Sequence, residues 1–339
     1  MQRCSRPLWP LRGNHEVDRP GAVRTFARER SASRGDRQAH DRAGRGPGQG
    51  ARGQRGPRHL AHHVRSAVSR RAAGFGLRRP KYPNPGRSFA GTVEAVSGDV
   101  TGFKPGDEVF GICDASFAQY VRVRTDKLAP KPADLSFDQA AAVPVSGLTA
   151  IQAVRDQGRV RAGQKVVIVG ASGGVGTFAV QIAKAYGAEV TAVCSTSKVE
   201  AVRALGADHV IDYTRADFAD GRHRYDVILD IGGNRRLSHL RRTLTPTGRL
   251  VIVGGETDGR WLGGTDRQLR ALVLSPFIGQ KLGTFISSEN AEDLEALRGL
   301  IESGKVSPAV DRTYPLDEVA AAIRYMLEGR TCGKLVITI

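Results

Sequence analysis

The fold is decided by residues 165–176, which read KVVIVGASGGVG. The first five are almost continuously apolar, as is typical of a strand buried on both faces of a parallel sheet. The glycines that follow allow a tight turn and a close approach of the backbone to a pyrophosphate. A helix predicted over Thr177–Tyr186 directs its amino-terminal N–H groups toward that charge, and Gly187 ends it. This order of strand, loop and helix predicts a dinucleotide-binding unit.

The next predicted strand, Glu189–Cys194, indicates which dinucleotide is bound. An NAD enzyme places Asp or Glu at the end of this strand, where the acid binds the ribose hydroxyls. Here the chain continues as Ser195-Thr196-Ser197-Lys198. Hydroxyls and one ammonium suit a 2′-phosphate, although the same residues also fit a polar loop with a solvated lysine. We therefore predict NADPH as the cofactor.

Three further strand patterns extend this unit into a doubly wound parallel sheet of the Rossmann type, within an α/β fold. They cover residues 206–213, 225–230 and 248–255. Asp212 and Asp230 stand at strand ends without a nearby histidine or second carboxylate. We interpret both as turn or helix-capping residues and assign them no chemistry.

The preceding part of the chain is predicted to be a small β domain. Short strands are expected over 87–96, 108–111 and 117–123, and a helix begins in 144–150. The sequence therefore divides into four parts, at residues 1–73, 74–146, 147–286 and 287–339.

Residues 1–73 differ in composition from the rest of the chain. They hold 17 Arg against five acidic residues, which is +12 of the net charge of +17, and no Lys, Ile or Tyr occurs before Lys81. Three interpretations are open: a disordered basic arm, a nucleic-acid-binding tail, or a translation in the wrong reading frame. We favour the third, because the frame one nucleotide downstream permits a coherent peptide, with only Ile or Thr at His62 and only Met or Thr at His63. The β domain would then lack its first strands.

Bulk properties exclude several classes of protein. No apolar run approaches the roughly 18 residues of a spanning helix, and no secretory signal is present, so a cytoplasmic protein without membrane contact is expected. The four cysteines are scattered and are predicted to be free thiols. Because most of the positive charge lies in residues 1–73, nucleic acid is not expected as a partner.

The glycine loop, the stretch GADHVIDY at 206–213 and the segment GKLVI at 333–337 resemble the quinone oxidoreductase branch of the medium-chain dehydrogenase/reductase superfamily. The resemblance covers about residues 74–339 and implies a catalytic domain with a GroES-like barrel, here incomplete at its amino terminus. It also implies a homodimer. It implies a cofactor site made of Thr149, Ser172, Gly173, Gly174, Val175, Ser195, Lys198, Tyr213 and Gly254.

Zinc is not expected in this chain. Zinc-dependent relatives carry Gly-His-Glu where this sequence has Gly86-Arg87-Ser88, and an arginine is not a zinc ligand. The lobe with four cysteines is reduced to Cys113. The chemistry that the resemblance implies is therefore NADPH-dependent hydride transfer to a quinone or an α,β-unsaturated carbonyl.

No residue is identified as the proton donor, and the substrate remains open. Tyr82 and Tyr120 are candidates, but a lone tyrosine in a barrel strand is more often a core residue. Residues 254–283 are expected to shape the substrate pocket, among them Trp261, Arg267, Phe277 and Gln280. If the first strands are missing, the chain could instead bind the cofactor without turnover.

Overall fold

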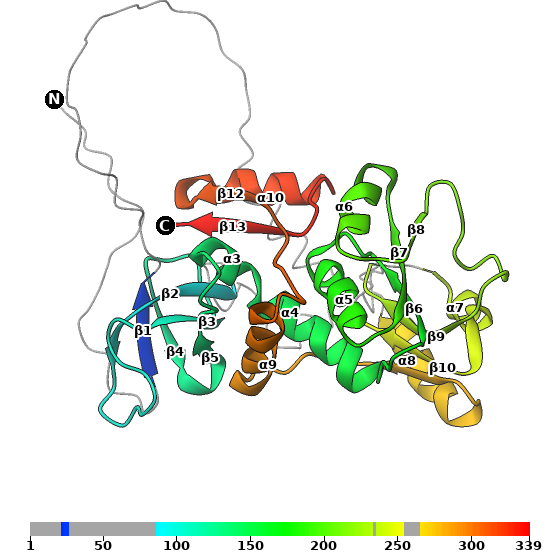
Figure 1. Ribbon diagram of the computed structural model, residues 1–339, viewed down its shortest axis with the longest axis horizontal. Coiled ribbons are helices and arrows are strands. Elements are labelled where there is room, and N and C mark those ends of the chain that lie inside the picture. The colour runs from blue at the N-terminus through cyan, green and yellow to red at the C-terminus, as the bar shows by residue number, and fades with distance from the viewer. Residues whose placement is uncertain (1–21, 27–85, 233–234, 254–264) are drawn as a thin grey trace, which may run out of the picture.

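The computed structural model describes residues 22–26, 86–232, 235–253 and 265–339. Figure 1 shows two β-sheets at opposite ends of the molecule, with helices α4 (Pro144–Ile151) and α9 (Ala291–Glu302) between them. The carboxyl-terminal strand lies back beside the first sheet. The chain thus passes from the first domain to the second and returns.

The second domain is built on a parallel sheet of six strands. In spatial order these are β11 (Lys281–Thr284), β10 (Leu244–Ile252), β9 (Tyr225–Asp230), β6 (Lys165–Val169), β7 (Glu189–Cys194) and β8 (His209–Asp212). The strand order reverses between β6 and β9. In doubly wound sheets, ligands bind at the carboxyl ends of the strands beside this reversal.

Strand β6 is buried on both faces, as its apolar run predicted. Val166 and Ile168 belong to one hydrophobic cluster, with side chains of α4, α9 and α5 (Gly174–Ala185). Val167 and Val169 belong to a second cluster on the other face, with side chains of α7 (Leu237–Thr243) and α8 (Thr265–Leu274). Helices therefore cover both faces, which confirms the doubly wound Rossmann architecture.

The first domain contains an antiparallel sheet of five strands. Their spatial order is β4 (Tyr120–Arg124), β1 (Ala22–Phe26), β2 (Ser88–Val96), β3 (Glu108–Ile112) and β5 (Leu128–Pro130). Its own core includes Phe89, Val93 and Leu128. Strand β1 comes from residues 1–73, where the sequence shows no strand pattern, and it pairs with both β2 and β4. We expected the barrel to lack its first strands. Apart from β1, the residues to which this expectation applies lie outside the described part of the chain.

The remaining elements connect the two domains or complete the first. They are η2 (Thr125–Lys127), α3 (Phe137–Ala142), η3 (Gln152–Gln157), η4 (Thr196–Lys198), α6 (Val199–Ala204), η5 (Ser275–Phe277), β12 (Val310–Pro315), η6 (Leu316–Glu318), α10 (Val319–Leu327) and β13 (Lys334–Thr338). Element η3 is a π-helical continuation of α4, in which Gly158 N donates to Ala153 O at 2.8 Å. Strands β12 and β13 form a parallel pair.

Three of the predicted strand boundaries needed correction. Strand β4 begins at Tyr120 rather than Phe117, because the chain bends before it, with Ala115 at a φ of 61°. Strand β8 covers four residues instead of eight. Strand β10 begins at Leu244, four residues before the expected Gly248, because Leu244 is fully buried and pairs with Tyr225 of β9.

Candidate cofactor site

Two positions in the glycine-rich loop between β6 and α5 require glycine, one because of its backbone conformation and one because of a close contact. Gly170 has a φ of +83°, a region that side chains strongly disfavour. A Cβ on Gly176 would overlap the carbonyl oxygen of Gly170 and lie 2.7 Å from the carbonyl carbon of Ala171. The loop is held in place by Gly173 N, which donates to Gly170 O at 3.1 Å. These glycines thus allow the tight turn and the close packing of α5 against the loop, while a Cβ on Gly173 would meet only Gly170 O, at 3.4 Å.

Helix α5 presents its positive end at this loop. Its N-cap is Gly173, and no side chain caps it. Thr177 closes the first turn instead, with its N–H donating to Gly173 O at 3.0 Å and its hydroxyl donating to Gly174 O at 3.1 Å. An uncapped helix start with free N–H groups is a ready binding site for an anion. The expected site residues Ser172, Gly173, Gly174 and Val175 all lie in this loop and turn.

The polar residues predicted to hold a 2′-phosphate lie at neighbouring strand ends. Ser195 and Lys198, both half-buried, follow β7, and Tyr213 follows β8 with its N–H donating to Cys194 O at 3.1 Å. The Lys198 ammonium donates to Gly329 O at 2.9 Å and to Thr331 O at 2.7 Å. The structure therefore places these three residues at the carboxyl ends of the neighbouring strands β7 and β8.

Asp212 beside them is a turn residue, as its sequence position predicted. Its carboxylate accepts hydrogen bonds from the Thr196 hydroxyl at 2.6 Å and from Thr214 N at 2.9 Å. The Thr196 hydroxyl, followed by Thr214, lowers the pKa of Asp212 below its ordinary value. The acid is thus engaged in fixing the loop and remains ionised.

The two residues expected at the nicotinamide have different outcomes. Thr149, in α4, is half-buried; its hydroxyl donates to Val145 O at 2.7 Å and contacts the Ser287 hydroxyl at 3.1 Å. Thr149 is therefore placed where the chain crosses back between the domains. Gly254 lies outside the described residues.

Asp230 differs from its sequence interpretation. It is fully buried at the carboxyl end of β9, and its carboxylate pairs with Arg267 of α8 at 2.8 Å. It is therefore a buried ion-pair residue rather than a turn or capping residue. Sequence reasoning missed this pair because the two residues meet only through the packing of α8 on the sheet.

The sequence also missed the part that the carboxyl terminus plays in this site. Gly333 N donates to Ser172 O at 2.9 Å, so the segment leading into β13 is bonded to the glycine loop. The side chain of Lys334 lies against Gly174. The one signal in the sequence was the segment GKLVI at 333–337, whose lysine is Lys334.

Ion pairs occupy the position where zinc-dependent relatives have a ligand. The Arg87 guanidinium pairs with Glu289 and, at 3.3 Å, with Asp114, and Lys127 also pairs with Glu289 at 2.7 Å. Burial raises the pKa of the neighbouring Cys113 thiol to about 12, so this cysteine stays protonated. Of the four cysteines predicted to be free thiols, three are free in the described part of the chain and Cys4 lies outside it; the three are Cys113, Cys194 and Cys332. Tyr120 is 47% exposed and is therefore not a core residue.

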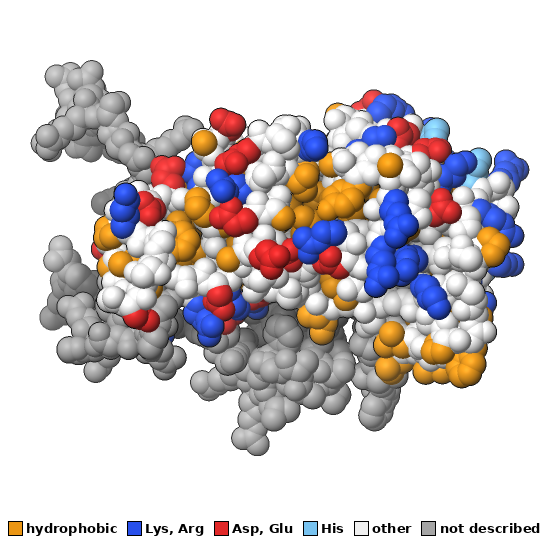
Figure 2. Space-filling model, turned by 60° about the horizontal axis from the view of Figure 1, so that its bottom comes forward, with side chains coloured by type: hydrophobic (Ala, Val, Ile, Leu, Met, Phe, Trp, Pro, Cys, Tyr) orange, Lys and Arg blue, Asp and Glu red, His pale blue; other side chains and the backbone are white. Residues whose placement is uncertain are grey.

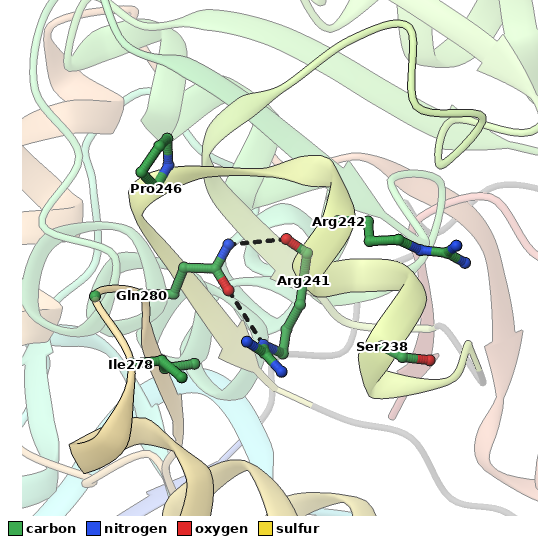
Figure 3. A pocket seen from close by; sticks show the side chains of 7 residues that line it. Ser238, Arg241, Arg242, Pro246, Ile278 and Gln280 are labelled. Carbon is green, nitrogen blue, oxygen red and sulfur yellow. Dashed lines mark hydrogen bonds between the residues drawn. The ribbon is translucent and has the colours of Figure 1, made fainter.

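A pocket of about 580 Å³ lies away from the glycine loop. Figure 3 shows its lining, in which Gln280 bridges to Arg241: Arg241 Nε donates to Gln280 Oε1 at 3.2 Å, and Gln280 Nε2 donates to Arg241 O at 2.8 Å. Gln280 precedes β11, and Pro246 lies in the first half of β10. The pocket is thus at the amino ends of the strands, opposite the carboxyl ends where the cofactor is expected. Gln280 therefore lines this pocket and not the expected substrate pocket.

Comparison with known protein families agrees with this geometry. Residues 61–133 match the alcohol dehydrogenase GroES-like domain, and residues 205–337 match the zinc-binding dehydrogenase domain. The chain is 34% identical to mouse NAD(P)H oxidoreductase RTN4IP1, mitochondrial, and 35% identical to tomato 2-methylene-furan-3-one reductase. Each match covers 75% of this chain, with 70% of the mouse protein and 63% of the tomato protein.

Two further similarities extend the comparison. The chain is 37% identical to the spectinabilin polyketide synthase system protein NorB of Streptomyces orinoci, over 75% of this chain but only 12% of NorB. Among solved structures, the quinone oxidoreductase from Coxiella burnetii superposes with a TM-score of 0.69 at 29% identity, over 79% of this chain and 82% of that one.

The two domain matches and the arrangement of the two sheets define a medium-chain dehydrogenase/reductase. Within that superfamily, the chain belongs to the quinone oxidoreductase-like branch and is an oxidoreductase. No described helix is long and apolar enough to cross a membrane.

Proposed function

We propose that this chain binds NADPH and reduces a quinone or an α,β-unsaturated carbonyl without zinc. The observation that carries the proposal is the uncapped start of α5 at a loop that tolerates no side chain at Gly176. The residues present fit a dinucleotide, because the bare backbone admits the pyrophosphate and the helix dipole favours its charge.

Preference for NADPH is supported by the residues that follow β7. No carboxylate stands directly at the end of this strand, and the Lys198 ammonium is fixed there by two carbonyl oxygens. An ammonium has three donors, so one N–H of Lys198 remains for a 2′-phosphate. Ser195 and Tyr213 add hydroxyls at the same edge.

The bound nicotinamide would supply a hydride, and a proton must reach the substrate from water or from a side chain. The chain's own part is to hold the cofactor at the carboxyl ends of β6 and β7, with Thr149 expected beside the nicotinamide. The zinc-free chemistry is supported by Arg87, whose cationic side chain is committed to Glu289 and Asp114. The enone or quinone acceptor is supported by the similarity of the chain to tomato 2-methylene-furan-3-one reductase and to the quinone oxidoreductase from Coxiella burnetii.

Titration of the purified chain with NADPH and NADH, followed by turnover assays with an enone and a benzoquinone, tests this function. We expect NADPH to bind more tightly than NADH, with reduction of at least one acceptor. Lys198→Met should weaken NADPH roughly tenfold and leave NADH unchanged, because only the 2′-phosphate contact is lost. Binding without any turnover would favour the alternative of a cofactor-binding protein, and equal affinity for both cofactors would contradict the NADPH preference.

The division of the chain is also a proposal: a catalytic domain in 74–146 and 287–339 around a cofactor domain in 147–286. It is supported by the five-stranded sheet before residue 147, the six-stranded sheet after it, and the packing of β13 on α3.

We propose that residues 1–73 are translated out of frame. Resequencing the gene across codons 15–74 tests this, because codons that forbid the shifted peptide would contradict it. A cytoplasmic location remains a prediction.

A further inference from the structure

The segment that leads into β13 is attached directly to the glycine-rich loop. Gly333 has a φ of +90°, its N–H donates to Ser172 O at 2.9 Å, and Lys334 N donates to Ala309 O at 2.9 Å. These bonds fix the backbone immediately before the Lys334 Cα. The start of β13 is therefore a rigid part of the wall around the proposed pyrophosphate position.

The side chain of Lys334 extends over the backbone of the helix start. A Cβ built on Gly174 would lie only 2.9 Å from Lys334 Cδ and 3.2 Å from the Ser146 hydroxyl oxygen. The absence of a side chain at Gly174 thus makes room for the lysine stem. Because the ammonium is two bonds beyond Cδ, it lies close to the first turn of α5.

The Lys334 ammonium has no partner of its own within the described part of the chain. Lys198, at the carboxyl ends of the same strands, is by contrast paired, because its ammonium donates to two carbonyl oxygens. Lys334 is half-buried, and burial lowers its pKa. An ammonium partly removed from water without a partner is unfavourable unless an anion compensates it.

We infer that Lys334 binds the pyrophosphate of the dinucleotide, beside the amino terminus of α5. The inference rests on the proposed cofactor function and adds to it a cationic residue contributed by the carboxyl-terminal segment of the first domain. Lys334 and Lys198 then have separate roles. The first contacts the phosphates common to NADPH and NADH, and the second contacts the phosphate that only NADPH carries.

Calorimetric titration of Lys334→Met and Lys198→Met with NADPH and NADH tests this division. We expect Lys334→Met to weaken both cofactors by the same factor, roughly tenfold or more, because a charge-assisted contact is lost from each. Lys165→Met is the matched control: Lys165 is exposed at the amino end of β6, the end opposite the loop, and its loss should change neither affinity. Thermal unfolding of the cofactor-free variants shows whether Lys334→Met remains folded.

Three outcomes would overturn the inference. Unchanged affinity of Lys334→Met for both cofactors would show that the ammonium does not reach the phosphates. A loss confined to NADPH would assign Lys334 to the 2′-phosphate instead. Weaker binding together with a lower unfolding temperature in the absence of cofactor would indicate a structural role. If the wild-type chain bound neither cofactor, the proposed function itself would fail, and this result is distinct from the other three.

Discussion

At the scale of single residues, Lys334 illustrates how a binding group can reduce the stability of the protein that carries it. Burial lowers its pKa below the ordinary 10.5, so the folded chain holds that proton more weakly than the unfolded chain does. The resulting penalty is fully present below the lowered pKa and disappears as the pH rises toward 10.5. The site is therefore prepared for an anion at the expense of the cofactor-free fold.

This linkage gives a stability prediction with a defined sign. Lys334→Met should raise the unfolding temperature of the cofactor-free protein near neutral pH, and the gain should shrink at about pH 10, where the wild-type lysine loses its charge. Thermal unfolding followed by circular dichroism at both pH values measures it, with Lys165→Met as the control. A gain that is equal at both pH values would show that the charge is not its cause.

The buried pair of Asp230 and Arg267 makes a contrasting prediction. Arg267→Met leaves a fully buried carboxylate without its guanidinium, which should cost about 3–5 kcal/mol of the free energy of unfolding. Urea denaturation measures this cost, and replacing Asp230 by Asn in the same chain should recover part of it. The exposed pair of Arg203 and Glu200 is the control, since Arg203→Met should cost about 0–1 kcal/mol. Similar costs for the two variants would contradict a structural role for the buried pair.

At the scale of elements, the sequence predicted the strands whose residues are buried on both faces. Strands β6, β7 and β9 begin and end at the predicted residues, because an uninterrupted apolar run has few alternative structures. Strand β8, at the sheet edge, is shorter than predicted because its residues are half-buried or exposed and the apolar pattern is weaker there. The loop residues of the cofactor site were predictable from local spacing. Lys334 was not, because it reaches the loop only through tertiary contacts.

Replacing glycine by alanine should have opposite effects on stability at two positions, one at the glycine loop and one in α9. Gly176→Ala should destabilise the protein and weaken binding of both cofactors, because the new Cβ would overlap the backbone of Gly170 and Ala171. Gly299→Ala should stabilise the protein by roughly 0.5–1 kcal/mol, since Gly299 is exposed within α9 and a Cβ there meets nothing. Urea denaturation and cofactor titration measure both variants. Wild-type binding by Gly176→Ala would contradict the proposed role of the loop.

At the scale of the whole molecule, the distribution of side chains supports the homodimer that the resemblance implied. Figure 2 shows hydrophobic side chains gathered at the end of the molecule that holds α8 in Figure 1. Val273 of α8 is 70% exposed and Phe277 of η5 is 82% exposed. Strand β11 beside them has a neighbour on one side only, β10, so its other edge lacks a strand partner within the described sheet. An exposed apolar surface next to an open strand edge is unfavourable in a monomer.

We therefore propose that two copies of the chain associate through this end, with β11 of one copy facing β11 of the other. Phe277→Asp should shift the protein from dimer to monomer in light scattering coupled to size-exclusion chromatography, because a charge in an apolar interface loses its hydration without gaining a partner. Met326→Asp is the matched control, since Met326 of α10 is 53% exposed at a different part of the molecule and should leave the dimer intact.

A wild-type chain that is monomeric at every concentration would refute the dimer, and dissociation by both variants would place the interface elsewhere. Because the cofactor edge is formed within one copy, the Phe277→Asp monomer should still bind NADPH, which separates assembly from cofactor binding.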